Sequence, residues 1–383
     1  MRAYLDNLAT TPLDPAVADA MNEVYRDAPG NPHARFHPFG RNAFETLERA
    51  RAEVAQAIGA SAEAVVFVPS ATAANNLAVL GVASRRRKHG RHVLVSAIEH
   101  ASVLEPAREL RRMGFEVEEV PVGAEGVVEP EAVRERLRAD TILVSVMAVN
   151  NEIGTIQPIE ALSEVVRSHG AVLHCDAAQA PGKIRLDGVV RADLVTLSSH
   201  KVHGPAGIAA LVVRKPEHAP RPLLYGGGQE RGAWPGTVPV ALAVGFAKAL
   251  RLAVERLDED RARIGRLESR LRAGIEMAWP GSHRNPRSGP VVPHCLSVTF
   301  RGVQGETVLG RLASAQVAAA FGSACSSEAS APSHVLRAIG LSAEEARRTL
   351  RFGFGRFTTG EEVQYTLEVL GGLAAELASR RLV

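Results

Sequence analysis

The sequence predicts an α/β fold in which helices sandwich a mostly parallel, seven-stranded sheet. Short runs of β-branched and apolar residues recur through the first half of the chain, and segments of helical length separate them. Strands that alternate with helices indicate βαβ units around a parallel sheet. The predicted strands span residues 64–68, 92–96, 115–120, 141–147, 171–175, 193–197 and 208–213.

Helices are predicted where apolar residues recur every three to four positions. Residues 42–58 place Phe44, Leu47, Val54 and Ile58 on one side, and residues 101–113 form another helix. Beyond Gly228 two long helices are expected, followed by a Pro/Gly-rich stretch and a smaller α+β unit. Their predicted ranges are 238–255 and 259–277 for the helices, then a strand at 296–300, a helix at 306–313, a loop at 321–332, a strand at 348–352 and a helix from 359.

The composition is that of an ordinary globular protein: 383 residues, 46% hydrophobic and 23% charged. The formal charge of +3 is too small to indicate a nucleic-acid or membrane partner. Three cysteines cannot form a disulfide framework, no signal core opens the chain, and no apolar run approaches the roughly 18 residues of a membrane span. We therefore expect a soluble, cytoplasmic protein.

Chemistry that needs an amine has few candidates, because the chain contains only five lysines. Lys201 follows the strand at 193–197, at the sheet edge where open α/β sheets present functional groups. Partial desolvation there would lower the pKa of its amine and favour Schiff-base chemistry. A lone lysine is usually a surface charge, so its neighbours decide the interpretation.

Two other strand ends add polar groups. Asp176 follows the strand at 171–175 and suits a charge partner for a pyridinium nitrogen, although alone it is also typical of a helix N-cap. Ser70-Ala71-Thr72 begins a helix, where free N–H groups attract an anion, although Thr72 alone is as typical of an ordinary cap. No phosphate-loop or dinucleotide motif occurs, which disfavours a nucleotide. An amine, a carboxylate and a phosphate site together predict pyridoxal phosphate.

A cysteine in a small-residue loop is a further candidate. Cys325 lies in Gly322-Ser323-Ala324-Cys325-Ser326-Ser327, whereas Cys175 and Cys295 lie in strand patterns typical of the core. Alone, an exposed cysteine is usually adventitious. Beside a pyridoxal site, Cys325 becomes a candidate nucleophile that travels to the substrate.

With these motifs the chain resembles the NifS/IscS-type cysteine desulfurases, which are fold-type I pyridoxal-phosphate enzymes. The resemblance runs from Tyr4-Leu5-Asp6-Asn7 to Gly355-Arg356-Phe357-Thr358-Thr359. Between them it rests on Asn31-Pro32, residues 37–40, Glu99-His100, residues 149–154, Gly182-Lys183, residues 226–230 and residues 332–336. It implies a large cofactor-binding domain at 14–257 and a small domain, formed by 1–13 and 258–383, that carries the cysteine loop.

The resemblance implies a role for each site residue. Lys201 would hold the cofactor and move the Cα proton, and Cys325 would attack the sulfur of bound L-cysteine. The other implied roles are ring stacking and acid/base help for His100, pairing with the ring nitrogen for Asp176, contact with the phenolate oxygen for Gln179, phosphate binding for Ala71, Thr72, Ser198 and His200, phosphate binding from the other subunit for Thr237, and substrate-carboxylate binding for Asn151 and Arg351. No metal site is expected.

The implied activity releases L-alanine and leaves a persulfide on Cys325, for transfer to an acceptor such as an iron–sulfur scaffold. A homodimer is also implied, because Gly236-Thr237 matches the segment lent across its interface. Alternatives are a selenocysteine lyase, a related pyridoxal-phosphate aminotransferase, or a non-catalytic sulfur-assembly partner. The sequence departs from the family pattern at Ser70, Ala73, His203, Ala206 and Trp234, which border the phosphate and dimer contacts.

Overall fold

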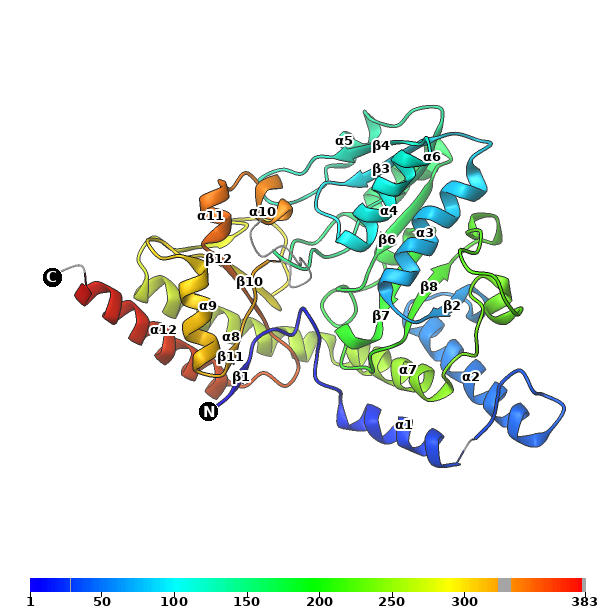
Figure 1. Cartoon of the computed structure of the whole chain (residues 1–383), viewed down its shortest axis with the longest axis horizontal. Coiled ribbons are helices and arrows are strands. Elements are labelled where there is room, and N and C mark those ends of the chain that lie inside the picture. The colour runs from blue at the N-terminus through cyan, green and yellow to red at the C-terminus, as the bar shows by residue number, and fades with distance from the viewer. Residues whose placement is uncertain (28, 323–331, 381–383) are drawn as a thin grey trace.

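The computed structural model describes residues 1–27, 29–322 and 332–380. At its centre lies a seven-stranded sheet with the order β2-β8-β7-β6-β5-β3-β4, drawn in Figure 1. Neighbours from β4 to β7 pair in parallel, and only β8 runs antiparallel to both of its neighbours. The strands are β2 (Val65–Val68), β3 (His92–Ser96), β4 (Glu116–Val120), β5 (Thr141–Ser145), β6 (Val172–Asp176), β7 (Leu194–Ser198) and β8 (Ala209–Val213). The predicted fold class and all seven strands are confirmed.

Helices cover both faces of this sheet, which explains why most of its strands are apolar runs rather than alternating ones; the edge strand β4, with three glutamates, is the exception. On β2, Val65 and Phe67 belong to one buried cluster, whereas Val66 and Val68 belong to another on the opposite face. The first cluster includes residues of α2 (Pro38–Ala57), α6 (Ile159–His169) and α7 (Val240–Glu255), and the second includes residues of α3 (Ala71–Arg86) and α4 (Ala101–Arg112). Helices α1 (Pro15–Asp27) and α5 (Pro130–Arg134) contact α7 and α6, respectively, in the first of these two groups.

Helix α2 begins four residues earlier than predicted. His37 is its N-cap: the Nδ1 atom of the ring accepts a hydrogen bond from the N–H of Gly40 at 3.0 Å, and Pro38 occupies the first helical position. Proline is favoured there because its fixed φ suits a helix and its missing N–H would have had no partner. The apolar periodicity that predicted this helix carries no information about its cap.

A smaller antiparallel sheet, β12-β10-β9, forms the second unit and lies to the left in Figure 1. Its strands are β9 (His283–Asn285), β10 (Cys295–Thr299) and β12 (Thr349–Gly353), and a separate parallel pair joins β1 (Ala3–Tyr4) to β11 (Val317–Ala318). The associated helices are α8 (Leu257–Ala278), α9 (Gly305–Ser314), α10 (His334–Ala338), α11 (Ala343–Arg347) and α12 (Gly360–Arg380). Short 3₁₀ turns are η1 (Ala62–Ala64), η2 (Val189–Arg191), η3 (Ser199–Lys201), η4 (Pro216–His218) and η5 (Gln229–Gly232).

The second unit has its own core. Ile264 and Leu271 of α8 pack with Phe352 of β12, and Leu5 from the N-terminal segment joins the same cluster. We keep the division into 14–257 and 1–13 with 258–383 as a proposal. Within the described residues, none of the helices combines the length and hydropathy that a membrane span requires.

Candidate active site

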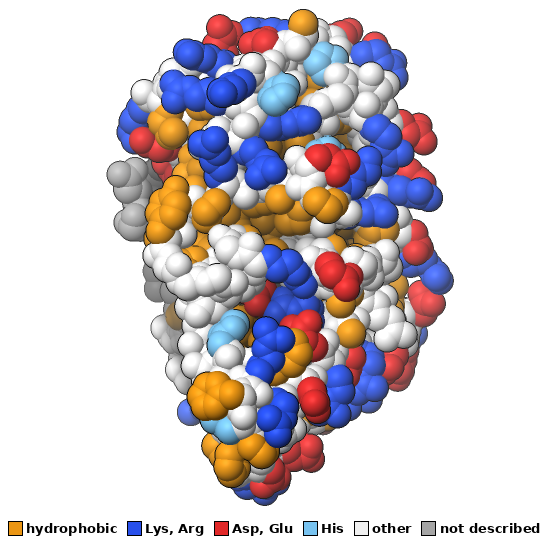
Figure 2. All heavy atoms as spheres, turned by 90° about the vertical axis from the view of Figure 1, so that its right-hand side faces the viewer, with side chains coloured by type: hydrophobic (Ala, Val, Ile, Leu, Met, Phe, Trp, Pro, Cys, Tyr) orange, Lys and Arg blue, Asp and Glu red, His pale blue; other side chains and the backbone are white. Residues whose placement is uncertain are grey.

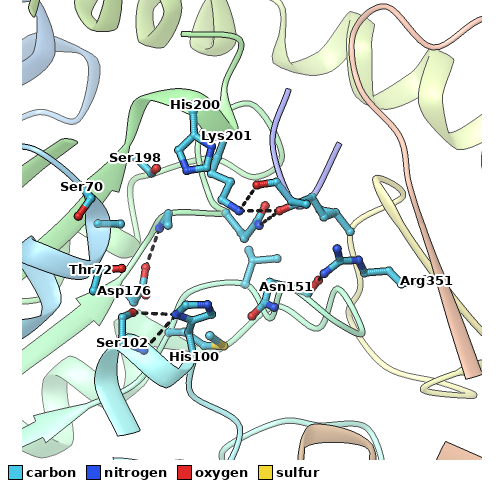
Figure 3. A pocket seen from close by; sticks show the side chains of 17 residues that line it. Ser70, Thr72, His100, Ser102, Asn151, Asp176, Ser198, His200, Lys201 and Arg351 are labelled. Carbon is cyan, nitrogen blue, oxygen red and sulfur yellow. Dashed lines mark hydrogen bonds between the residues drawn. The ribbon is translucent and has the colours of Figure 1, made fainter. Parts of the chain in front are cut away.

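A cavity of about 210 Å³ lies where β6 and β7 end, and it collects nearly all of the predicted site residues (Figure 3). Its lining includes Ala71, Thr72, His100, Asn151, Asp176, Gln179, Ser198, His200, Lys201 and Arg351. Thr237 instead lines a separate cavity of about 160 Å³, beside Phe67 and Trp234. Cys325 and the remainder of 323–331 lie outside the described residues.

Lys201 ends the turn η3, directly after β7. Its Nζ donates hydrogen bonds to the carbonyl oxygens of Leu8 at 2.8 Å and Ala9 at 2.7 Å, so the N-terminal segment forms one wall around the amine. The tight turn depends on Gly204, because a Cβ there would lie 2.2 Å from Ser199 Oγ. The tight turn thereby places the Lys201 side chain at the cavity.

A network of hydrogen bonds joins Asp176 to His100 across the cavity wall. Asn75 Nδ2 donates to Asp176 Oδ2 at 2.7 Å and to Ser102 Oγ at 2.8 Å, and Ser102 Oγ lies 2.8 Å from His100 Nδ1. The second carboxylate oxygen, Oδ1, accepts the N–H of Ala178 at 2.9 Å. Asp176 is therefore the last residue of β6 and caps a turn; its interpretation as a helix N-cap was wrong.

The tautomer of His100 follows from its contacts. Its Nδ1 accepts the backbone N–H of Ser102 at 3.1 Å, as the N-cap of α4, so the ring proton lies on Nε2. Burial lowers the pKa of His100, and the nearby Asp176 carboxylate opposes that effect. His100 thus lines the cavity as a neutral imidazole with one N–H donor.

The N-terminus of α3 forms the opposite end of the cavity. Ser70 is the helix cap, with its Oγ accepting the N–H of Ala73 at 3.1 Å, so Thr72 is not the cap and its exposed side chain lies at the cavity. Ser198 Oγ is buried and has no hydrogen-bond partner within the part of the chain that the structure describes. His200 completes this end, and burial together with the charge of Lys201 lowers its pKa to about 4.

Gln179 has one committed and one unused polar atom. Its Nε2 donates to the carbonyl oxygen of Leu8 at 2.9 Å, whereas its buried Oε1 has no partner among the described residues. A buried polar atom without a partner is costly, so such an atom beside a cavity indicates a ligand group. With Ser198 Oγ, it gives two such atoms on one cavity.

Arg351 closes the side that faces the smaller unit. Only 2% of the residue is exposed, and its Nη1 donates to the carbonyl oxygens of Asn151 at 2.8 Å and Gly322 at 2.9 Å. Its Nη2 donates to Asp6 Oδ1 at 2.9 Å in a salt bridge. The guanidinium therefore lies at the cavity already paired with a carboxylate of this chain.

Sequence reasoning missed Asn75 and Ser102, and it named Glu99 only as part of the Glu99-His100 motif, without a role. Asn75 is fully buried on α3, and a polar residue at a core position of a helix is the signal that could have found it. Burial raises the pKa of Glu99 to about 8, against its hydrogen bonds from Ser96 Oγ and the N–H of Met147. It lies directly before His100.

The residues present fit pyridoxal phosphate. The cavity offers an amine at Lys201, a buried carboxylate at Asp176 for a ring nitrogen, and the unpartnered Ser198 Oγ at a helix N-terminus for a phosphate. Among the described residues no three His, Cys, Asp or Glu side chains gather as a metal site.

Comparison with protein families gives the class. The model of the class-V aminotransferase family matches residues 3–366, and this family uses pyridoxal phosphate. Among its relatives, "Cysteine desulfurase IscS" of Pseudomonas aeruginosa is 44% identical over 94% of this chain and 90% of its own length.

Solved structures agree. A "NifS-like protein" superposes with a TM-score of 0.91, at 36% identity, over 98% of this chain and 100% of its own. "SspA in complex with cysteine" has a TM-score of 0.80 at 34% identity, over 93% and 100% of the two chains. The chain belongs to the NifS/IscS-type cysteine desulfurases within the class-V aminotransferase family.

Proposed function

We propose that this chain is a pyridoxal-phosphate-dependent cysteine desulfurase that converts L-cysteine to L-alanine and holds the released sulfur as a persulfide on Cys325. The observation that carries the proposal is a single cavity that joins Lys201, Asp176 and the N-terminus of α3 to Arg351, in a chain 44% identical to a protein named as such an enzyme. A structural neighbour whose title names bound cysteine supports the substrate.

Each residue receives a role from its position. Lys201 would hold the cofactor, with Asp176 at the ring nitrogen, Gln179 Oε1 at a ring oxygen, and the phosphate at Ala71, Thr72, Ser198 and His200. His100 would lie against the ring, and Arg351 with Asn151 would bind the substrate carboxylate, which competes there with Asp6. When bound, the cofactor withdraws electrons from the substrate Cα and makes its proton acidic.

The chain's own groups then carry out the chemistry. The Lys201 amine would take the Cα proton and later return it. The neutral His100 would offer the N–H group at Nε2 as a hydrogen-bond donor. The Cys325 thiolate would attack the substrate Sγ, forming an S–S bond as the Cβ–S bond breaks. The electron pair of that bond stays with the carbon skeleton, which takes up protons and leaves as L-alanine.

The other two cysteines are poor nucleophiles. Cys175 and Cys295 are buried, and burial raises the pKa of Cys175 well above its usual value and that of Cys295 to about 12. The thiolate is the reactive form, so neither residue supplies one near neutral pH. This supports Cys325 as the residue that accepts sulfur.

Incubation of the purified protein with L-cysteine tests the proposal. Alanine and a persulfide located on Cys325 by mass spectrometry are expected; Lys201→Ala should remove both, and Cys325→Ala should stop sulfur transfer while the cofactor absorbance remains. Cys295→Ala is the matched control and should retain both products. A persulfide elsewhere, or full sulfur release by the Cys325 variant, would contradict the proposal, and the latter would favour a lyase.

We also propose a homodimer in which Thr237 serves the other subunit's site. Thr237 lines a cavity with Phe67, Val68 and Trp234 rather than the cavity of Lys201. Figure 2 shows hydrophobic side chains forming a band between charged groups on the face that lies to the right in Figure 1. Large exposed hydrophobic residues include Phe36, Phe39, Leu224 and Tyr225, which favours a covered surface. A sulfur-acceptor protein and a cytoplasmic location stay predictions.

A further inference from the structure

A second lysine lies directly behind the turn that carries Lys201. Lys183 follows β6 in a turn at Gly182, whose φ of +71° favours glycine, and a Cβ on Gly182 would lie 3.1 Å from Ala253 Cβ of α7. Lys183 is only 4% exposed, and its Nζ donates to the carbonyl oxygen of Lys201 at 3.3 Å. Lys201 thus has its side chain at the main cavity and its carbonyl oxygen bound to the buried amine of Lys183.

The space around Lys183 contains little negative charge available to its amine. A small cavity of about 30 Å³ is lined by Lys183, His203, His294, Asp260 and Arg356, among others. The Asp260 carboxylate is paired with Arg356 Nε at 2.9 Å. Within the described residues, Lys183 has no salt bridge of its own.

The other titratable groups near Lys183 are two histidines, His203 and His294, and one thiol, Cys295. His203 Nδ1 contacts the carbonyl oxygen of Pro12 at 2.9 Å, and its Nε2 accepts the N–H of Arg356, which holds the ring neutral. Burial lowers the pKa of both His203 and His294. Burial, and secondly the charge of Lys201, lowers the pKa of Lys183 to about 7, whereas Cys295 opposes this shift. Two amines therefore compete for protons across one turn.

We propose that Lys183 is a positioning residue that acts through Lys201. Its amine binds the Lys201 carbonyl oxygen, and its positive charge makes a second positive charge on the Lys201 amine less favourable. A neighbouring cation is a known way to keep a lysine amine neutral, and only the neutral amine attacks an aldehyde. The inference rests on the proposed function, because it concerns the lysine that would hold the cofactor.

Lysine NMR on the unmodified holoenzyme tests the first half. With five lysines, ¹³Cε-labelled lysine gives few signals, which single Lys→Met variants assign. The Lys183 signal is expected to titrate near pH 7. A Lys183 midpoint above about 9 would overturn the proposal.

Two substitutions test the coupling through the pH midpoint of the cofactor absorbance, which requires no sulfur release. Lys183→Met removes the cation and should raise this midpoint by about 0.5 to 1 pH unit, whereas Lys183→Arg, always charged, should leave it equal or lower it. Lys88→Met is the control and should not move it. A midpoint that moves alike in both variants, or in neither, would assign Lys183 a merely structural role and overturn the proposal.

Alanine release is measured separately. Its absence in the unmodified protein would contradict the proposed function, while the two midpoints still decide the role of Lys183.

Discussion

Glu99 gives a prediction whose sign depends on pH. The side chain is fully buried; its Oε1 accepts from Ser96 and Met147, and its Oε2 is buried without a partner in the described part of the chain. Burial raises its pKa from 4.5 to about 8. Between these values the unfolded chain has released a proton that the folded chain retains.

Stability therefore falls as the pH rises from about 4.5 to about 8, and levels off above that. At about 1.4 kcal/mol per pH unit, the full effect is on the order of 5 kcal/mol. Glu99→Gln imitates the protonated acid, keeps the Oε1 acceptor, and removes this dependence.

Thermal unfolding at several pH values provides the assay. The Glu99→Gln protein should melt at about the same temperature as the parent near pH 5, and about 5 °C or more above it near pH 8.5. Glu129→Gln, at an exposed position, is the matched control and should show no such trend. A difference in melting temperature that stays constant with pH, or that shrinks as the pH rises, would refute the reasoning.

Two further predictions concern a buried ion pair and an unpartnered hydroxyl. Arg51 donates from Nη1 and Nη2 to Glu230, both at 2.7 Å, so Glu230→Gln should lower the free energy of unfolding in urea by about 3 to 5 kcal/mol. Adding Arg51→Met should recover part of that loss, and strict additivity would contradict the coupling. Ser198→Ala removes a hydroxyl that lacks a partner among the described residues, so the cofactor-free protein should melt no lower, while the Kd for pyridoxal phosphate rises about tenfold. Unchanged affinity would exclude Ser198 from the phosphate site.

Much of the large sheet was predictable because most of its strands are buried on both faces. Continuous apolar runs then mark strands directly, and their ends locate Asp176 and Ser198 at one edge. Both residues proved to be the last residues of their strands rather than the first of a loop. The ladder continues because Ala148 and Ala177 N–H groups bond the carbonyl oxygens of Asp176 and Thr196.

Features that depend on distant backbone or on single caps could not be predicted. The start of α2 depends on a histidine ring, and the turn at Asp176 on the N–H of Ala178. The Asn75 contact with Asp176 joins residues 101 positions apart, and a helical pattern indicates only that Asn75 is an exception on a buried face. Periodicity reports which face is buried, not which polar groups meet there.

The N-terminal segment illustrates the same limit and explains how the two units meet at the site. Asn7 Nδ2 donates to the carbonyl oxygen of Gly353 on β12, and Asp6 pairs with Arg351 on the same strand. The carbonyl oxygens of Leu8 and Ala9 receive the Lys201 amine. Backbone carbonyls have no sequence signature, so nothing in these residues alone indicates contact with a lysine almost two hundred positions away. One short segment, residues 6–9, therefore contacts both the Lys201 amine and the Arg351 guanidinium, and it joins the two units at the site by direct contacts rather than through the large sheet.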